Sequence, residues 1–190
     1  MKRLLLAFSA CLVVMVTMSE AMTAADINFL KFVGQESLDN IKAQVKKDDT
    51  QPKTREAEYR KNLLESAISN PDPKVLEFFL KLGLYPSSGM GNPLMPIFTH
   101  ARVNLVAKMK LLVAAGANVN EPGTFNVTPI AFAARCTNAE APEVLEFLLD
   151  AGANPHVRVP GMHQIIDFAR ENKQLQGTKA LARLEKILAK

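Results

Sequence analysis

Three apolar segments of the chain share an order of residues, and each ends at a glycine. Val75–Gly83 and Val144–Gly152 carry the same residue at six of their nine positions. A shorter copy, Leu111–Gly116, lies between them, and the three glycines are 33 and 36 residues apart. Apolar segments that recur at this spacing are typical of solenoid proteins, in which each repeat packs on the next.

Each repeat predicts two short helices and a turn. In the first repeat, Asp72 and Pro73 mark the start of the second helix, because Asp is favoured as an N-cap and Pro at the first helical position. Gly83 ends this helix, since the left-handed conformation after a helix suits glycine best. The third repeat has Pro142 and Gly152 at the same places. Its second helix is apolar over so wide an arc that it is expected to pack on both sides.

The two ends of the chain predict helical caps. Asp26–Lys46 carries the pattern of a helix pair, and a charged connection leads from it into the first repeat. At the C-terminus, an inner apolar stripe is expected to face the stack, with a polar outer face formed by Lys179, Arg183, Lys186 and Lys190. The resulting division is a leader at 1–25, a capping region at 26–58, and repeats over 59–190, at about 59–88, 89–123, 124–157 and 158–190.

The repeats resemble the ankyrin-repeat family. The best match is Ala115–Asn120 (AGANVN), followed by Thr128–Ala134 (TPIAFAA), and Ala151–Pro155 (AGANP) repeats the first part. The resemblance covers about residues 59–190. It implies an all-α solenoid of paired short helices with finger turns between the pairs. Asn126 stands where the family usually has glycine, and the turn is expected to survive because Asn also adopts positive φ.

One departure from the family pattern concerns a helix. Pro96 falls inside the expected first helix of the second repeat. A proline in a helix interior removes a hydrogen bond, so this residue puts the geometry of that helix in question.

The first residues of the chain predict a signal peptide. Lys2 and Arg3 precede the apolar run Leu4–Met18, and small residues follow. This is the three-part layout of a Sec-type secretory signal, and the run is shorter than the roughly 20 residues that span a bilayer. Cleavage after Ala21 or after Ala25 fits the pattern. We therefore expect a periplasmic or secreted protein without a stable membrane anchor after cleavage.

Composition narrows the class of protein. Apolar residues make up 48% and charged residues 22%, as in an ordinary globular domain, and the formal net charge is +4. Because basic and acidic residues are interspersed, the charge does not predict a nucleic-acid partner. Cys11 lies in the predicted signal peptide, so the mature chain keeps only Cys136 and cannot form an internal disulfide.

Groups that could support catalysis or bind a metal are few. Cys136 and His100 both match a late position of a first helix in neighbouring repeats, so a Cys–His couple is conceivable. No third group is evident, and the alternative is a bystander thiol. His156 and His163 alone do not make a defined zinc site. The sequence therefore predicts a protein that is not an enzyme and needs no metal or cofactor.

The ankyrin resemblance implies a partner-binding surface. Proteins of this family bind partners with their finger tips and the exposed positions of their first helices. Alignment transfers this role to Glu65, Thr99, His100, Phe132 and Arg135 on first helices and to Phe125 and Arg158 on fingers. Phe125 and Phe132 stand where the family usually has polar or variable residues, and an exposed aromatic near an arginine is typical of a binding hot spot. The alternative for Phe132 is packing against a neighbouring helix.

These observations favour a non-catalytic periplasmic protein that binds another protein through its concave face. One hypothesis is an immunity protein that occludes the active site of a toxic enzyme, since occlusion needs no chemistry of its own. An alternative is an envelope stress-defence factor that supports a redox enzyme. A Cys136-dependent enzyme and an effector delivered to a host cell are further alternatives, which thiol reactivity and detection outside the cell would test.

Overall fold

The chain folds into short helices, which confirms the predicted all-α class. The computed structural model describes residues 22–47, 55–84, 91–123, 126–157 and 164–189. The elements within these ranges are all helices: α2 (Ala24–Gln35), α3 (Leu38–Lys47), α4 (Ala57–Ser69), α5 (Pro73–Lys81), α6 (Met95–His100), α7 (Leu105–Ala114), α8 (Pro129–Arg135), α9 (Ala141–Asp150), α10 (Ile165–Glu171) and α11 (Lys179–Leu188).

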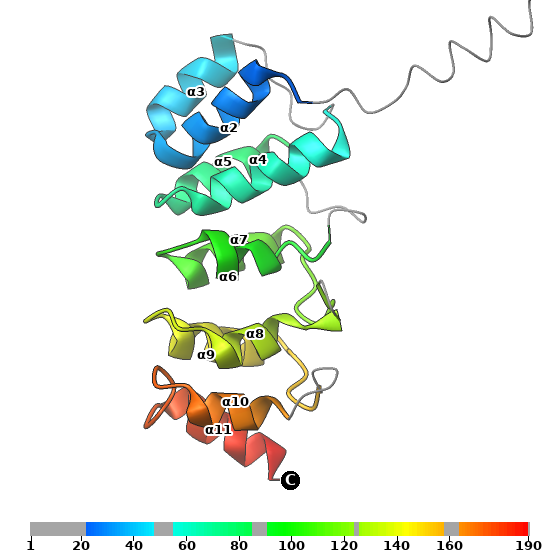
Figure 1. Cartoon of the computed structure of the whole chain (residues 1–190), viewed down its shortest axis with the longest axis vertical. Coiled ribbons are helices and arrows are strands. Elements are labelled where there is room, and N and C mark those ends of the chain that lie inside the picture. The colour runs from blue at the N-terminus through cyan, green and yellow to red at the C-terminus, as the bar shows by residue number, and fades with distance from the viewer. Residues whose placement is uncertain (1–21, 48–54, 85–90, 124–125, 158–163, 190) are drawn as a thin grey trace, which may run out of the picture.

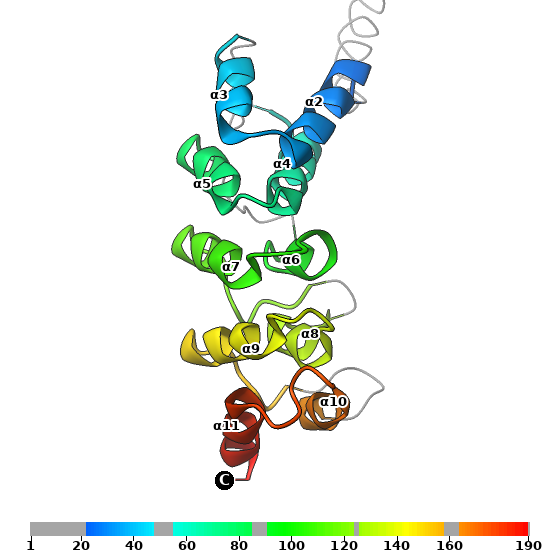
Figure 2. The ribbon, with the colours of Figure 1, turned by 90° about the vertical axis from the view of Figure 1, so that its left-hand side faces the viewer.

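The helices form pairs, and the pairs stack along the long axis of the molecule (Figure 1). Helices α2, α4, α6, α8 and α10 contact one another in that order and make one row. Helices α5, α7, α9 and α11 make a second row, which lies beside the first (Figure 2). The outer surface of the row that begins with α2 is called the first-helix face below.

The core is continuous through both rows. It contains fully buried side chains from successive pairs, among them Leu63, Ile97, Ile130 and Ile165 from the first-helix row and Leu76, Met109, Leu145 and Leu184 from the other. Helix α9 lies between α7 and α11, which confirms the expectation that it packs on both sides. Each fully buried Leu or Ile stabilises the fold by about 1.5–3 kcal/mol, so stacking supplies much of the folding free energy.

Helix starts and ends follow the local signals in the sequence. The Asp72 carboxylate accepts the backbone N–H of Lys74 at 2.9 Å, and Pro73 occupies the first turn of α5. Gly83, Gly116 and Gly152 have φ of 88°, 99° and 83°, the left-handed conformation expected after each second helix.

The two unusual residues of the repeats are also accommodated. Asn126 has a φ of 57°, so asparagine does adopt the left-handed conformation expected in its turn. Pro96 does not interrupt a helix, because α6 begins at Met95 and Pro96 lies in its first turn. The backbone nitrogens of a first turn have no partner within the helix, so proline sacrifices no hydrogen bond there.

Four asparagines spaced 34 residues apart link each pair to the preceding one. Each lies between the two helices of its pair, and each side-chain amide donates to backbone carbonyls of the previous repeat at 2.8–3.0 Å. The residues are Asn70, Asn104, Asn138 and Asn172. In three of them the side-chain oxygen also accepts the backbone N–H two residues later, at 2.9 Å. This asparagine ladder hydrogen-bonds polar backbone that stacking would otherwise bury without partners.

The ladder was missed in the sequence, although its regular spacing is visible there. The repeats were predicted from apolar segments and glycines, and these glycines are 33 and 36 residues apart, whereas the asparagines keep a constant spacing of 34.

The C-terminal pair differs in one respect from the expected outer cap. Lys179 and Lys186 are exposed, as a polar outer face requires. Arg183, by contrast, forms an ion pair with Asp150 at 2.7 Å and another with Glu146, both on α9. The guanidinium therefore joins α11 to α9 instead of facing solvent alone. Lys190 lies outside the described residues.

Replacement of Gly152 by valine is expected to destabilise the protein by about 1–2 kcal/mol, because a β-branched residue is strained at positive φ. A Cβ at this position would meet no atom within 4 Å, so the loss arises from the backbone conformation alone. Urea unfolding followed by circular dichroism measures the difference. Gly152→Asn is the control and should lose less, since Asn tolerates this conformation; equal stability of the two variants would contradict the assignment.

Replacement of Asn70 by alanine is expected to destabilise the protein by about 1–3 kcal/mol. Asn70 is only 2% exposed, and its amide donates to the carbonyls of Val33 and Glu36, which lose this donor in the variant. The exposed Gln174→Ala is the control, with an expected change within about 0.5 kcal/mol. Equal denaturation midpoints for the two variants would show that the ladder does not stabilise the stack.

Candidate functional site

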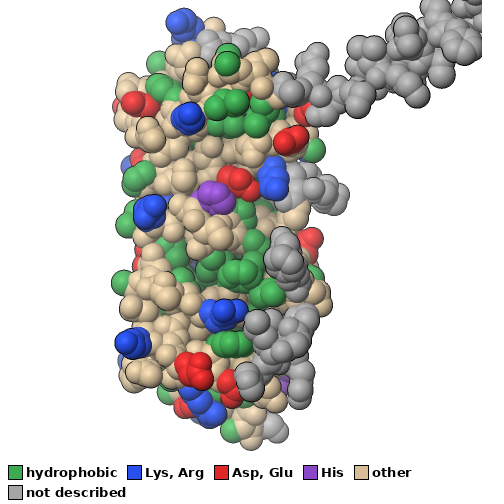
Figure 3. All heavy atoms as spheres, in the orientation of Figure 1, with side chains coloured by type: hydrophobic (Ala, Val, Ile, Leu, Met, Phe, Trp, Pro, Cys, Tyr) green, Lys and Arg blue, Asp and Glu red, His purple; other side chains and the backbone are tan. Residues whose placement is uncertain are grey.

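A groove crosses the middle of the first-helix face. It has a volume of about 370 Å³ and is open to solvent. Helices α4, α6 and α8, the turn before α6 and the finger before α8 contribute its lining: Lys61, Glu65, Gly91, Asn92, Met95, Pro96, Thr99, His100, Gly123 and Phe132. Hydrophobic side chains gather over the middle of this face, with charged side chains above and below them (Figure 3). We call this the first-helix groove.

One part of the groove is polar. His100 Nε2 lies 3.9 Å from Glu65 Oε2, so the two side chains form an ion pair when the imidazole is protonated. Thr99 Oγ1 lies 2.8 Å from His100 Nδ1 and fixes the orientation of the ring. Both Thr99 and His100 are exposed, so a ligand in the groove can reach these two residues.

The other part of the groove is apolar. The Phe132 ring stacks on Phe98 with 5.6 Å between the ring centroids, and it is half-buried. Phe132 therefore packs against the neighbouring helix, as the second interpretation of the sequence expected, and it also lines the groove. Met95 and Pro96 continue the apolar surface beside it.

The finger before α8 forms a wall of the groove. The buried amide of Asn92 donates to the carbonyls of Asn118 and Glu121 in this finger. Gly123 approaches Met95 so closely that a Cβ at Gly123 would lie 2.6 Å from Met95 Cγ. A side chain at this position would therefore displace Met95 or push the wall outwards.

Four of the seven residues that the sequence predicts for partner binding lie together in the first-helix groove. Glu65, Thr99, His100 and Phe132 come from three different repeats and meet in the groove. The guanidinium of Arg135 lies over the Phe168 ring, 5.0 Å from its centroid, and so contacts the following pair. Phe125 and Arg158 lie outside the described residues, as does His163.

Lys61 and Met95 are groove residues that the sequence analysis did not select. Lys61 lies one helical turn before Glu65 on α4, a spacing that places both side chains on one face of the helix. This i,i+4 relation was a usable signal. The sequence contained no such signal for Met95, because its position in the groove depends on the finger that packs against it.

The Cys136 thiol is not arranged as an activated nucleophile. Cys136 is half-buried, and burial raises the pKa of its thiol, although a hydrogen bond from the Asn138 backbone opposes the shift. His100 contacts Thr99 and Glu65, as described above, so the Cys–His couple gains no support from these contacts.

A buried lysine lies outside the groove. Lys108 is fully buried in α7, and its Nζ donates to the Val103 carbonyl at 3.0 Å. Burial lowers the pKa of this amine, while the Glu140 carboxylate partly offsets the effect. The sequence did contain a signal, because Lys108 aligns with Val75 and Val144 when the repeats are superposed on their glycines.

Within the described ranges, no three His, Cys, Asp or Glu side chains come together as ligands for a metal ion. The helices of these ranges also include none with the length and apolar character needed to cross a membrane.

Comparisons with known proteins do not assign the chain to a family. No protein-family model and no curated protein matches it. Among solved structures, it is similar to one chain of a complex between a predatory endopeptidase from Bdellovibrio bacteriovorus and an immunity protein. The TM-score is 0.48 and the identity 17%, over 87% of this chain and 99% of the matched chain. A likeness at this level establishes no function.

Cys136 is expected to react slowly with iodoacetamide at neutral pH, because the raised pKa leaves little thiolate. The rate should increase only as the pH approaches and passes the ordinary range of a thiol. The measurement uses a Cys11→Ser variant, so that Cys136 is the one thiol in the chain. The same variant unfolded in urea is the control and should react faster. Faster labelling of the folded protein at neutral pH would instead indicate an activated thiolate.

Proposed function

We propose that this protein is an exported, non-catalytic ankyrin-repeat protein that binds another protein through the first-helix groove. The stacked helix pairs, the glycines at positive φ and the intact turn at Asn126 are features that the ankyrin resemblance implies, and they support this proposal. Export is proposed from the basic and apolar segments at the start of the chain.

The observation that carries the proposal is the convergence of site residues from three repeats. Glu65 on α4, Thr99 and His100 on α6, and Phe132 on α8 line one open groove. An aromatic surface beside hydrogen-bonding groups and charges is the composition of a protein–protein hot spot with a polar rim. The groove therefore has the chemistry to bind a protruding segment that carries both apolar and polar side chains.

The scaffold also favours binding. The groove residues on α4, α6 and α8 are held by helices that contact one another in one row. A backbone held in packed helices loses little conformational freedom when a partner binds, so more of the contact energy appears as affinity.

The state of Cys136 supports binding over nucleophilic catalysis. A thiol with a raised pKa is mostly protonated at neutral pH, whereas a nucleophilic cysteine acts as its thiolate.

The role we propose for this binding is immunity against a toxic enzyme. A protein that covers an active site needs a complementary surface and no catalytic group of its own. The first-helix groove is the surface that we propose for this contact, and export would bring it to enzymes outside the cytoplasm.

The test uses the mature chain as bait in an envelope extract, with identification of the captured protein and assay of its enzymatic activity. We expect the wild-type chain to capture one enzyme and to inhibit it. The variant Phe132→Ala/His100→Ala should weaken the complex by about 2–4 kcal/mol, because both side chains line the groove. Circular dichroism checks that this variant remains helical.

The matched control is Lys110→Ala/Glu143→Ala, which changes two exposed residues on α7 and α9 in the other row. It should bind and inhibit like the wild type. Equal loss in both variants would remove the groove assignment. Capture of an enzyme whose activity is unchanged by the bound chain would remove the immunity role while retaining the binding function.

A further inference from the structure

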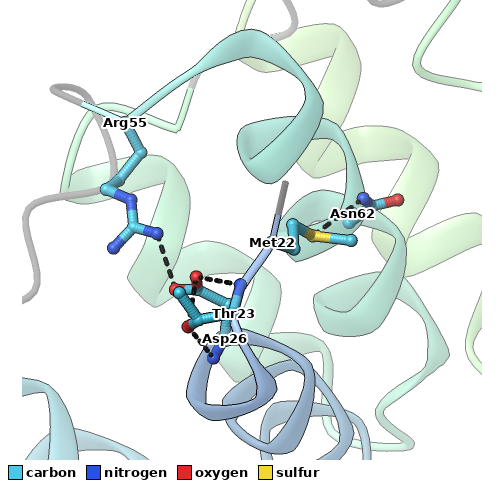
Figure 4. A network of polar contacts seen from close by, with 5 residues as sticks. All are labelled: Met22, Thr23, Asp26, Arg55 and Asn62. Atoms are coloured by element: carbon cyan, nitrogen blue, oxygen red, sulfur yellow. Dashed lines mark hydrogen bonds and ion pairs between the residues drawn. The ribbon is translucent and has the colours of Figure 1, made fainter. Parts of the chain in front are cut away.

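The segment from Met22 to Asp26 is integrated into the folded domain. It lies against α4 and contacts residues of that helix and of the turn before it (Figure 4). These contacts bear on the signal peptide, because one of the two cleavage points that fit the sequence precedes this segment and the other lies within it, between Ala25 and Asp26.

Thr23 and Asp26 form a complete capping box at the start of α2. The Asp26 backbone N–H donates to Thr23 Oγ1 at 3.1 Å, and the Thr23 backbone N–H donates to Asp26 Oδ2 at 2.9 Å. The Thr23 hydroxyl also donates to Asp26 Oδ2, at 2.7 Å. This arrangement satisfies backbone donors at the start of the helix, and the Thr23 hydrogen bonds lower the pKa of the Asp26 carboxyl.

Two tertiary contacts tie the same segment to α4 and to the turn before it. Arg55 Nη2 lies 2.6 Å from Asp26 Oδ1, and the Arg55 guanidinium also stacks over the Tyr59 ring at 4.0 Å. The Asn62 amide donates to Met22 Sδ at 3.3 Å, so the residue before the N-cap also takes part (Figure 4).

The surroundings of Met22 suit a new positive charge. A pocket of about 320 Å³ is lined by Met22 together with three acidic residues, Asp26, Glu56 and Glu58. Three carboxylates outnumber the one guanidinium of Arg55 in that lining. An α-amino group on Met22 would therefore lie in a region with an excess of negative charge.

We infer that export cleaves the chain between Ala21 and Met22, which retains the whole segment Met22–Asp26, called the capping segment below, in the mature protein. This inference rests on the export proposed above. In the reaction, a signal peptidase hydrolyses one peptide bond with one water molecule. The C–N bond breaks, Ala21 gains a carboxylate and Met22 gains an α-amino group. The Ser19-Glu20-Ala21 sequence provides the small residues that such an enzyme requires.

Cleavage after Ala25 would remove essential parts of this arrangement. It would delete Met22, Thr23 and the first two residues of α2, and with them the capping box and the Asn62 contact. It would also place a positive α-amino group at the start of α2, where the helix dipole disfavours a cation. The bond after Ala25 lies inside the first turn of α2, whereas the bond before Met22 precedes the N-cap.

The experiment exports the full chain from a bacterium and determines the N-terminus of the periplasmic product by intact mass and Edman sequencing. We expect Met22 as the first residue. Two matched substitutions then test the choice of bond, since a bulky side chain directly before the bond blocks cleavage. Ala21→Tyr should abolish the Met22 terminus, while Ala25→Tyr, at an exposed position of α2, should leave it unchanged.

The N-terminus and the location of the product distinguish a wrong cleavage site from a failure of export. A periplasmic product that begins at Asp26, or loss of processing in Ala25→Tyr alone, would overturn this inference and leave export intact. A periplasmic product that retains the predicted signal peptide would overturn the cleavage and leave export intact, whereas absence of the protein from the periplasm would overturn both.

A second experiment compares the melting temperatures of the mature protein and its variants. Thr23→Ala should lower the melting temperature by about 2–4 °C, because it removes the N-cap hydrogen bonds of α2. The neighbouring exposed Ala24→Ser is the control and should leave the melting temperature nearly unchanged. An unchanged melting temperature in Thr23→Ala would show that the capping segment does not stabilise the mature fold, and would remove the reason to retain it.

Discussion

Stacking is the interaction on which the rest of this structure depends, because no helix pair can bury its apolar residues by itself. Helix α9 shows this most clearly: Val144, Leu145 and Leu148 are fully buried, and the helix lies between α7 and α11. An isolated pair would leave one of these surfaces in water. The apolar core therefore continues from pair to pair, and each repeat stabilises its neighbours.

Stacking also covers backbone carbonyls that need hydrogen-bond donors, and the asparagine ladder supplies these donors. Bringing one pair onto another covers backbone carbonyls at the ends of the first helices, and Asn70 and Asn172 each donate to two of these in the preceding repeat. Because the same side chains also accept a backbone N–H two residues later, they fix both the turn and its distance from the neighbouring repeat. The position of each helix within the rows thus depends on a polar contact as well as on apolar packing.

The first-helix groove is a consequence of this arrangement. Its walls come from helices far apart in the chain, and its shape depends on Phe132 meeting Phe98 and on Gly123 lying against Met95. The capping segment likewise depends on contacts between parts of the chain that are far apart in sequence. Met22 and Asp26 contact residues of α4 and of the turn before it. Partner binding and signal-peptide cleavage are therefore both proposed at places where separate segments of the chain meet.

The sequence by itself determined the helical class, the helix start at Asp72 and Pro73, and the left-handed conformation of Gly116 and Gly152, because these are properties of short stretches of chain. It also identified Glu65, Thr99, His100 and Phe132 through the resemblance of the repeats. Only the tertiary structure decided which of them meet, why Arg135 lies over Phe168 instead, and how Lys108 is buried beside the Val103 carbonyl. Those outcomes depend on the offset between stacked helices, and that offset is set by packing and by the asparagine ladder across many residues at once, not by any local pattern.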